Sequence, residues 1–138
     1  MIDKRFDTPR PVRLEVRLPI ANVEITTVDA TESTVTVSGS ERLLEGTRVE
    51  LDGDLLLVQM QRKLFGGFSH HFSGEDLIVR ATVPHGSRVE IVSASGDADL
   101  NGTFERLDVK SASGDVRAAG AITGDGTVNT VSGDIRLP

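Results

Sequence analysis

Aspartates recur beside a serine and a glycine at three places near the end of the chain, and carboxylates at a fixed spacing are the first residues here that could do chemistry. The three tripeptides are separated by steps of 18 and then 19 residues: Ser95-Gly96-Asp97, Ser113-Gly114-Asp115 and Ser132-Gly133-Asp134. If they stack at the strand spacing of about 4.8 Å, three like charges fall in one column. The carboxylates then either turn to solvent and accept hydrogen bonds from backbone amides, or share a cation.

Catalysis by this column is not expected. A glycosidase needs two carboxylates about 5–9 Å apart, one of them with a pKa raised by burial, whereas aspartates in a turn column face solvent. Calcium-binding β-rolls repeat about every nine residues with a Gly-Gly-x-Gly-x-Asp pattern, which this chain lacks. The sequence also contains no Ser-His-Asp order, phosphate loop or dinucleotide fingerprint. We therefore expect no catalytic residue, no metal site and no cofactor, with a carbohydrate-active enzyme as a minor alternative.

The residues around the tripeptides alternate between apolar and polar, which is typical of half-buried strands. Apolar residues occupy the position five before each glycine (Ile91, Val109, Val128) and the position two after it (Ala98, Val116, Ile135). Polar residues lie between them, and Asp99 is expected beside Arg117 as an opposite-charge neighbour. The repeat predicts an all-β fold, a β-solenoid or flattened two-sheet equivalent with a coil period of 18–19 residues.

The tripeptide itself has a structural explanation. A corner between two short strands needs a backbone with positive φ, which glycine adopts without the steric cost of a Cβ atom. Aspartate and, more weakly, serine side chains bond to backbone groups nearby. The three tripeptides are therefore predicted to form a structural turn column.

The first half of the chain predicts hairpins that continue into the repeat. Val12 to Leu18 alternates as one strand bounded by prolines, and Val23 begins a second. Asp52-Gly53 predicts a two-residue turn that places Val49 opposite Leu56. Further strands are expected from Val35 and over residues 77–83, and residues 40–46 predict one helical turn capped by Ser40. By length the chain is one domain, 1–138, with a hairpin-rich half (1–83) and repeat coils (84–138).

A segment rich in aromatic and histidine side chains precedes the strand expected over residues 77–83. Residues 64–75 contain Phe65, Phe68, His70, His71 and Phe72. One interpretation is a loop that contacts a partner, and the other is a cap in which the phenylalanines cover one end of the solenoid. Metal binding by the histidine pair is disfavoured, because adjacent side chains in a strand point to opposite faces.

Composition excludes several function classes. The net charge of −6 argues against a nucleic-acid binder, and the absence of cysteine, tryptophan and tyrosine removes thiolate chemistry and stacking platforms. The charged N-terminus is unlike a secretory signal, and no apolar run is long enough to span a bilayer. We expect a cytoplasmic location for the chain as written, and the cell surface only if a leader is missing. A small-molecule ligand and membrane insertion are not expected.

Val83-Pro84, the small turn His85-Gly86-Ser87 and the strands punctuated by Ser-Gly-Asp together resemble a bacterial family of unknown function, the putative adhesins. The opening residues 6–16 (FDTPRPVRLEV) are similar to actinobacterial members. The resemblance implies an all-β, solenoid-like fold and brings no catalytic residues. Family chains often carry more coils, so a fragment of a longer repeat protein is one reading of this chain.

Two functions follow. In the first, the solenoid is a non-catalytic, adhesin-like binding or scaffold domain that displays a rigid surface to a protein or cell-surface partner. In the second, it polymerises as bactofilins do, by end-to-end stacking of coils, because an uncapped coil leaves an unpaired strand edge.

Overall fold

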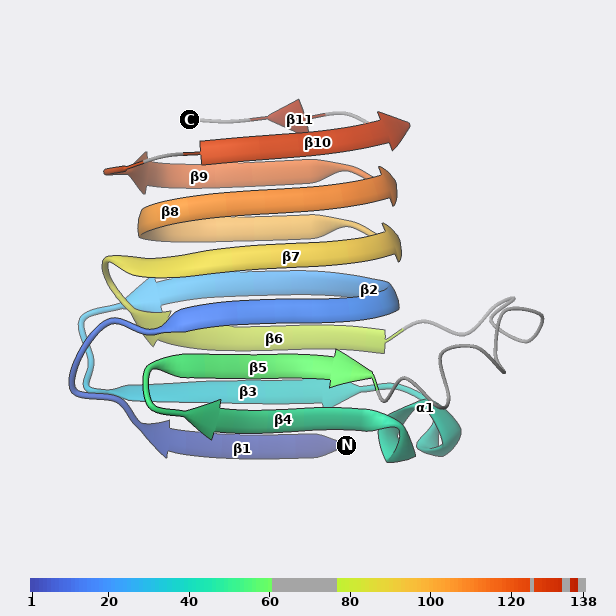
Figure 1. Cartoon of the computed structure of the whole chain (residues 1–138), viewed down its shortest axis with the longest axis horizontal. Helices are drawn as coiled ribbons and strands as arrows, with labels where there is room; N and C mark the ends of the chain where they lie inside the picture. Colours follow the sequence, from blue (N-terminus) through green and yellow to red (C-terminus); the bar gives the residue numbers. More distant parts are fainter. Residues whose placement is uncertain (61–76, 125, 133–134, 137–138) are drawn as a thin grey trace.

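A computed structural model of the chain describes residues 1–60, 77–124, 126–132 and 135–136. The described part is all-β apart from one short helix, and its eleven strands form a single hydrogen-bonded sheet (Figure 1). The elements are β1 (Ile2–Asp7), β2 (Arg13–Val28), β3 (Glu32–Ser38), α1 (Glu41–Glu45), β4 (Thr47–Asp52), β5 (Leu55–Met60), β6 (Leu77–Pro84), β7 (Ser87–Ser95), β8 (Ala98–Ser113), β9 (Val116–Ile122), β10 (Gly126–Ser132) and β11 (Ile135–Arg136).

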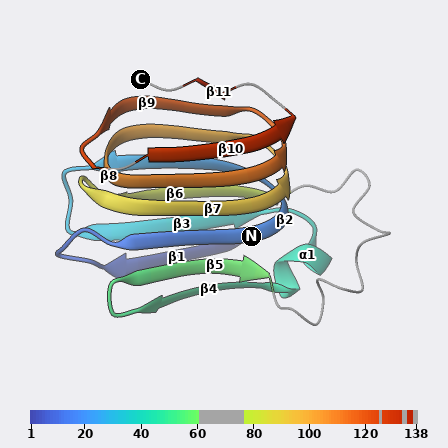
Figure 2. The ribbon, with the colours of Figure 1, turned by 45° about the horizontal axis from the view of Figure 1, so that its top comes forward.

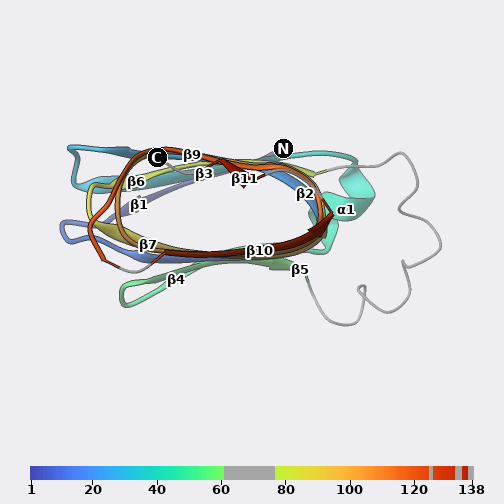
Figure 3. The same ribbon diagram turned by 90° about the horizontal axis from the view of Figure 1, so that it is seen from above.

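The sheet coils back on itself into two flat layers, which Figure 3 shows face to face. One layer contains β4, β5, the first part of β2, β7, the second part of β8, and β10. The other contains β1, β3, β6, the second part of β2, the first part of β8, β9 and β11. The long strands β2 and β8 cross from one layer to the other, so the fold is solenoid-like, as the repeat predicts.

Neighbouring coils pair in parallel and in register (Figure 2). Ile91 is aligned with Val109 and Ala98 with Val116, as the sequence columns predict. Asp99 is likewise aligned with Arg117. In-register parallel stacking places each residue over the equivalent residue of the next coil, which produces columns of like side chains.

Apolar columns fill the space between the layers. Leu14, Val89 and Leu107 form one buried column in the first layer. Ile25, Leu100 and Ala118 form another in the second layer. The period-two pattern thus places alternate side chains in a common core, and burial of this apolar surface is the main force that holds the layers together.

Strand β2 corrects the prediction of two separate strands before and after Pro19. It runs unbroken through Pro19, because that residue lies where the chain turns from one layer to the other and has no partner in the ladder with β7. Ile20 is aligned with Ser95, so Ala21 and Asn22 occupy the corner that Gly96 and Asp97 occupy in the next coil. β2 is therefore a coil of the same kind without the Ser-Gly-Asp signature.

The corners require glycine for the reason that the sequence suggested. Gly96 and Gly114 have φ angles of 123° and 130°. A Cβ atom on Gly96 would lie 1.8 Å from the carbonyl oxygen of Ala21, and one on Gly114 would lie 1.9 Å from that of Gly96. The tight stacking of successive corners therefore excludes any larger side chain at these two positions.

The hairpin of β4 and β5 forms, but its predicted turn is wrong by one residue. The turn residues are Gly53 and Asp54, so Leu51 rather than Val49 is opposite Leu56. Gly53 has a φ of 61°, which places the glycine at the first turn position. The inward face is unchanged, because the pairing shifts by two residues and the side-chain period is two.

The helical turn predicted for residues 40–46 is confirmed as α1. The Ser40 hydroxyl accepts a hydrogen bond from the backbone amide of Leu43 at 3.3 Å, and the chain leaves the helix at Gly46. Strand β1 was not predicted; it pairs antiparallel with β3, and its Lys4 donates a hydrogen bond across to the Val49 carbonyl at 3.1 Å. None of the described helices has the length and apolar character needed to cross a membrane.

Candidate functional site

In the Ser-Gly-Asp turn column a carboxylate accepts a hydrogen bond from a backbone amide, which is one of the two arrangements expected for these carboxylates. The Asp97 carboxylate accepts a hydrogen bond from the backbone amide of Asp115 at 2.8 Å. One coil below, the Asn22 side-chain oxygen accepts from the amide of Asp97 at 3.0 Å. Each side chain therefore caps the corner of the next coil, which gives the column a structural role.

A cation on this column finds no support in the described residues. Within them, no group of three or more histidine, cysteine, aspartate or glutamate side chains could hold a metal ion. Ser132 continues the serine column above Ser113, whereas Gly133 and Asp134 lie outside the described residues. The proposed contact loop, with Phe65, Phe68, His70, His71 and Phe72, also lies outside them.

A surface that the sequence did not indicate lies on the outside of the first layer. It consists of three rows of outward side chains, which we call the charged face: Arg13, Glu15 and Arg17 on β2, Arg88, Glu90 and Val92 on β7, and Arg106, Asp108 and Lys110 on β8. Register stacks these rows into a column of three arginines, a column of three carboxylates and a column that contains Arg17 and Lys110. Columns of opposite charge therefore lie side by side across three coils.

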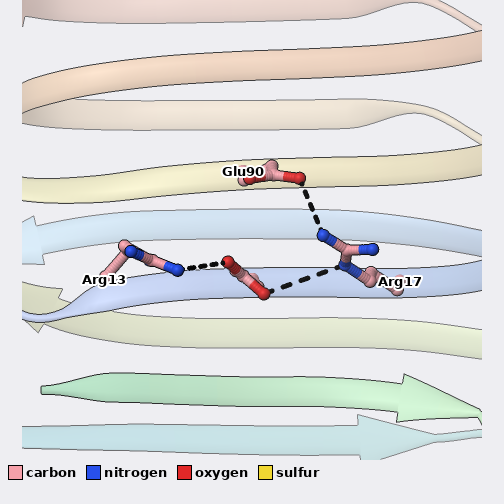
Figure 4. Close-up of polar contacts among 4 residues, drawn as sticks. Arg13, Arg17 and Glu90 are labelled. Atoms are coloured by element: carbon pink, nitrogen blue, oxygen red, sulfur yellow. Dashed lines mark hydrogen bonds and ion pairs between the residues drawn. The ribbon is translucent and has the colours of Figure 1, made fainter.

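Ion pairs link the columns on the first two rows (Figure 4). Glu15 contacts Arg13 at 3.0 Å and Arg17 at 3.8 Å, and Arg17 reaches Glu90 on the next coil at 3.2 Å. The Glu15 side chain is only 11% exposed, whereas those of Arg13 and Arg17 are about half exposed. The two arginines thus cover a carboxylate that would be costly to bury alone.

Beside these pairs the charged face is hollowed. A depression of about 210 Å³, which we call the charge hollow, is lined by Arg13, Arg88, Val89, Glu90, Arg106 and Asp108. Arg13 and Arg88 also line a second depression, of about 270 Å³, which extends towards Pro11 and Gly86 at the start of β2 and β7. Polar surface of both signs is therefore concentrated in a concave part of an otherwise flat layer.

Arg88 is held at the edge of the charge hollow by Glu105. The two side chains lie 2.9 Å apart, and each is about half exposed. The hydrogen bond that Glu105 accepts, together with its negative charge, raises the pKa of Arg88 above its ordinary value. Glu105 lies next to the irregularity in the β7–β8 register, where Ser87 pairs with Phe104 and Arg88 with Arg106. The β-bulge thus supplies the carboxylate that positions Arg88.

Part of this surface could have been predicted from the sequence. Arg88 and Arg106 both stand eight residues before their Ser-Gly-Asp glycines, three positions before the apolar column of Ile91 and Val109. Arg13 could not be aligned with them, because its coil has Ala21-Asn22 where the others have Gly-Asp. Charges arranged in this way can bind a partner by ion pairs and hydrogen bonds, and they offer no aromatic surface for stacking.

Comparison with known proteins gives likenesses of fold. No curated protein matches the chain. A solved structure of a putative lipid binding protein from Parabacteroides distasonis is similar with a TM-score of 0.52 and 14% identity, over 99% of this chain and 59% of that one. This chain therefore spans less than two thirds of that protein.

This chain also covers nearly the whole length of two further solved structures. A putative cell adhesion protein from Clostridium sporogenes has a TM-score of 0.49 and 6% identity, over 99% of this chain and 98% of that one. A putative adhesin from Bacteroides fragilis has a TM-score of 0.47 and 9% identity, over 99% and 96%. The family model of the Toastrack DUF4097 domain matches residues 12–138. The chain belongs to the Toastrack DUF4097 family.

Proposed function

We propose that this protein is a non-catalytic binding or scaffold domain whose β-solenoid coils, of 18–19-residue period, display the charged face to a protein or cell-surface partner. The observation that carries the proposal is the in-register stacking of β2, β7 and β8, which places a column of arginines beside a column of carboxylates. Because the backbone ladder fixes the spacing of these rows, the charges are preorganised and lose little conformational entropy when a partner binds.

The chemistry of the face favours recognition over catalysis. The carboxylates of Glu15 and Glu90 are engaged with arginines, which suits them to electrostatic complementarity with a partner. A general acid or base would instead need a carboxylate held ready for a proton in a buried site. The similar structure named as a putative lipid binding protein is in keeping with a binding role.

The proposal is tested by comparing which faces of the domain a partner needs. Immobilised wild-type protein is used for capture from cell extract beside a variant with Arg106→Glu and Lys110→Glu on the charged face. The matched control carries Arg80→Glu and Arg117→Glu, the same change of charge on the outside of the other layer. We expect a partner that wild type and control retain and that the charged-face variant loses.

A partner captured equally by all three proteins would contradict the role of the charged face. A fourth protein lacking residues 64–75 tests the predicted contact loop separately. Loss of capture by that protein alone would transfer the binding role from the charged face to the loop.

A further inference from the structure

Most charges that line the charge hollow already have partners. Arg13 pairs with Glu15 at 3.0 Å, Arg88 with Glu105 at 2.9 Å, and Glu90 with Arg17 at 3.2 Å. Two lining residues remain, one cation and one carboxylate, both on β8. Over the part of the chain that the structure describes, no ion pair joins Arg106 or Asp108 to another side chain.

The pair on β8 differs from the pair at the same spacing on β2. Arg13 and Glu15, two residues apart on the outside of their strand, meet at 3.0 Å. Arg106 and Asp108 have the same separation two coils away, and aspartate is one methylene shorter than glutamate. Oδ1 of Asp108 is buried without a hydrogen-bond donor among the described residues. A buried carboxylate oxygen without a donor is costly, so a donor is expected when the site is filled.

The shape of the hollow decides what could supply that donor. Its volume is about 210 Å³, and it is a depression open to solvent on one side. A small molecule or the terminal group of a larger one can therefore reach its lining.

We propose that the charge hollow binds a small zwitterion, with its anionic group on the guanidinium of Arg106 and its protonated amine on Asp108. This inference deepens the proposed binding role and rests on it. An oxyanion matches the planar donor fork of arginine, and an ammonium group offers three donors to a carboxylate. A zwitterion also adds no net charge to a hollow whose other charges are balanced by neighbours.

A sugar fits the hollow less well. Sugar rings are commonly held by stacking on aromatic side chains, and this chain contains no tryptophan and no tyrosine. The two free charges are of opposite sign, which a neutral sugar would leave unmatched and a simple anion would match only in part. A free amino acid and the headgroup of an ethanolamine lipid share the required chemistry, and the experiment separates these two sources.

The test is a titration of the full chain followed by NMR, with amide and side-chain resonances of Arg106 and Asp108 as reporters. The probes are L-serine for an amino acid, glycerophosphoethanolamine (a phosphodiester without net charge) for a lipid headgroup, and acetate and ethanolamine for either charge alone. Exposed ion pairs are weak, so we expect a dissociation constant on the order of 1 mM for a zwitterion. Of the two zwitterionic probes, the one that binds more tightly identifies the source of the ligand.

Asp108→Glu is the diagnostic variant. The added methylene lets the carboxylate reach Arg106 as Glu15 reaches Arg13, so we expect zwitterion binding to weaken by about tenfold or more. Asp108→Asn keeps the shape and removes the charge, and it should lose binding likewise. Arg117→Gln, on the outside of the other layer, should bind as wild type does. If Asp108→Glu does not fold, Arg106→Gln takes its place.

Binding of acetate as tight as that of either zwitterion would overturn the proposal, as would unchanged binding by both Asp108 variants. Absence of any shift with all four probes would overturn it too. These failures are distinct from failure of the proposed function, because face-dependent capture of a partner is measured without small-molecule probes. Capture that survives Asp108→Glu, together with lost zwitterion binding, would show that the partner uses the charged face outside the hollow.

Discussion

Asn22 and Asp97 show how one polar residue can hold two coils together. Each side-chain oxygen accepts a hydrogen bond from the backbone amide of the next corner, at 3.0 Å for Asn22 and 2.8 Å for Asp97. The Ser-Gly-Asp aspartate thus satisfies an amide that the sheet ladder cannot reach, because the chain turns there. Asparagine does the same in β2, which explains why that coil escapes a search for the tripeptide.

Removal of the Asp97 acceptor should lower stability modestly. For Asp97→Ala we expect the free energy of unfolding to fall by about 1 kcal/mol, the usual net contribution of a hydrogen bond. Asp97→Asn keeps an oxygen in place and should stay close to wild type. Urea denaturation followed by circular dichroism measures both. The control is Asp99→Ala, an exposed aspartate two residues along the same coil; a loss there as large as that of Asp97→Ala would contradict the corner ladder.

The glycine at the same corner should tolerate no side chain. Gly96→Ala forces a Cβ atom to within 1.8 Å of a backbone oxygen at a φ of 123°. We expect a loss of at least about 3 kcal/mol in the free energy of unfolding, or failure to fold. Gly53→Ala is the control, since its Cβ would meet nothing within 4 Å, and only the strain of its positive φ, about 1 kcal/mol, should remain. Equal losses from the two variants would refute close stacking at the corner.

Strand β2 is the element on which the two layers depend. Its first part pairs with β5 and β7, and its second part with β6 and β8. It therefore joins the antiparallel N-terminal strands to the parallel coils. Its apolar residues lie in the core between the two layers, so a cavity beneath it should destabilise the whole sheet.

Leu14→Ala tests that dependence. Leu14 is fully buried in the β2 column of the core, and its truncation should lower the free energy of unfolding by about 2–5 kcal/mol in a single cooperative transition. Ile78→Ala, on the outside of β6 and 40% exposed, should cost about 1 kcal/mol or less. The measurement is chemical denaturation monitored by two probes. A small loss for Leu14→Ala, or separate transitions for the two halves of the chain, would contradict a shared core.

The sequence predicted the repeat coils and their register better than it predicted the N-terminal strands. Strict alternation and the Ser-Gly-Asp repeat identified the coils, the column partners and the pairing of Asp99 with Arg117, because these follow from a period of two and a fixed repeat. The β4–β5 turn was wrong by one residue, since Asp52-Gly53 and Gly53-Asp54 are both good turn pairs. Strand β1 was missed because its charged residues give little alternation, and it lies at an edge where charges are favoured.

The charged face could not be predicted because it depends on the arrangement of the whole molecule. Arg13 and Arg88 are far apart in the sequence, and only the pairing of β2 with β7 brings them into one column. Asp108 likewise lies beside Glu90 only because β7 pairs with β8. A sequence repeat gives the columns, whereas the chemistry of a column is decided by the residues in which its coils differ.

At the scale of the molecule, the solenoid brings three strands together in register and so forms one preorganised surface. The central claim is that a partner binds there, on the outside of β2, β7 and β8. Hydrogen exchange measured by mass spectrometry, on the domain alone and with its captured partner, tests this claim most directly. The account predicts slowed exchange over the first part of β2, over β7 and over the second part of β8, with β3, β6 and β9 unchanged. Slowing confined to β3, β6 and β9 on the other layer would contradict it.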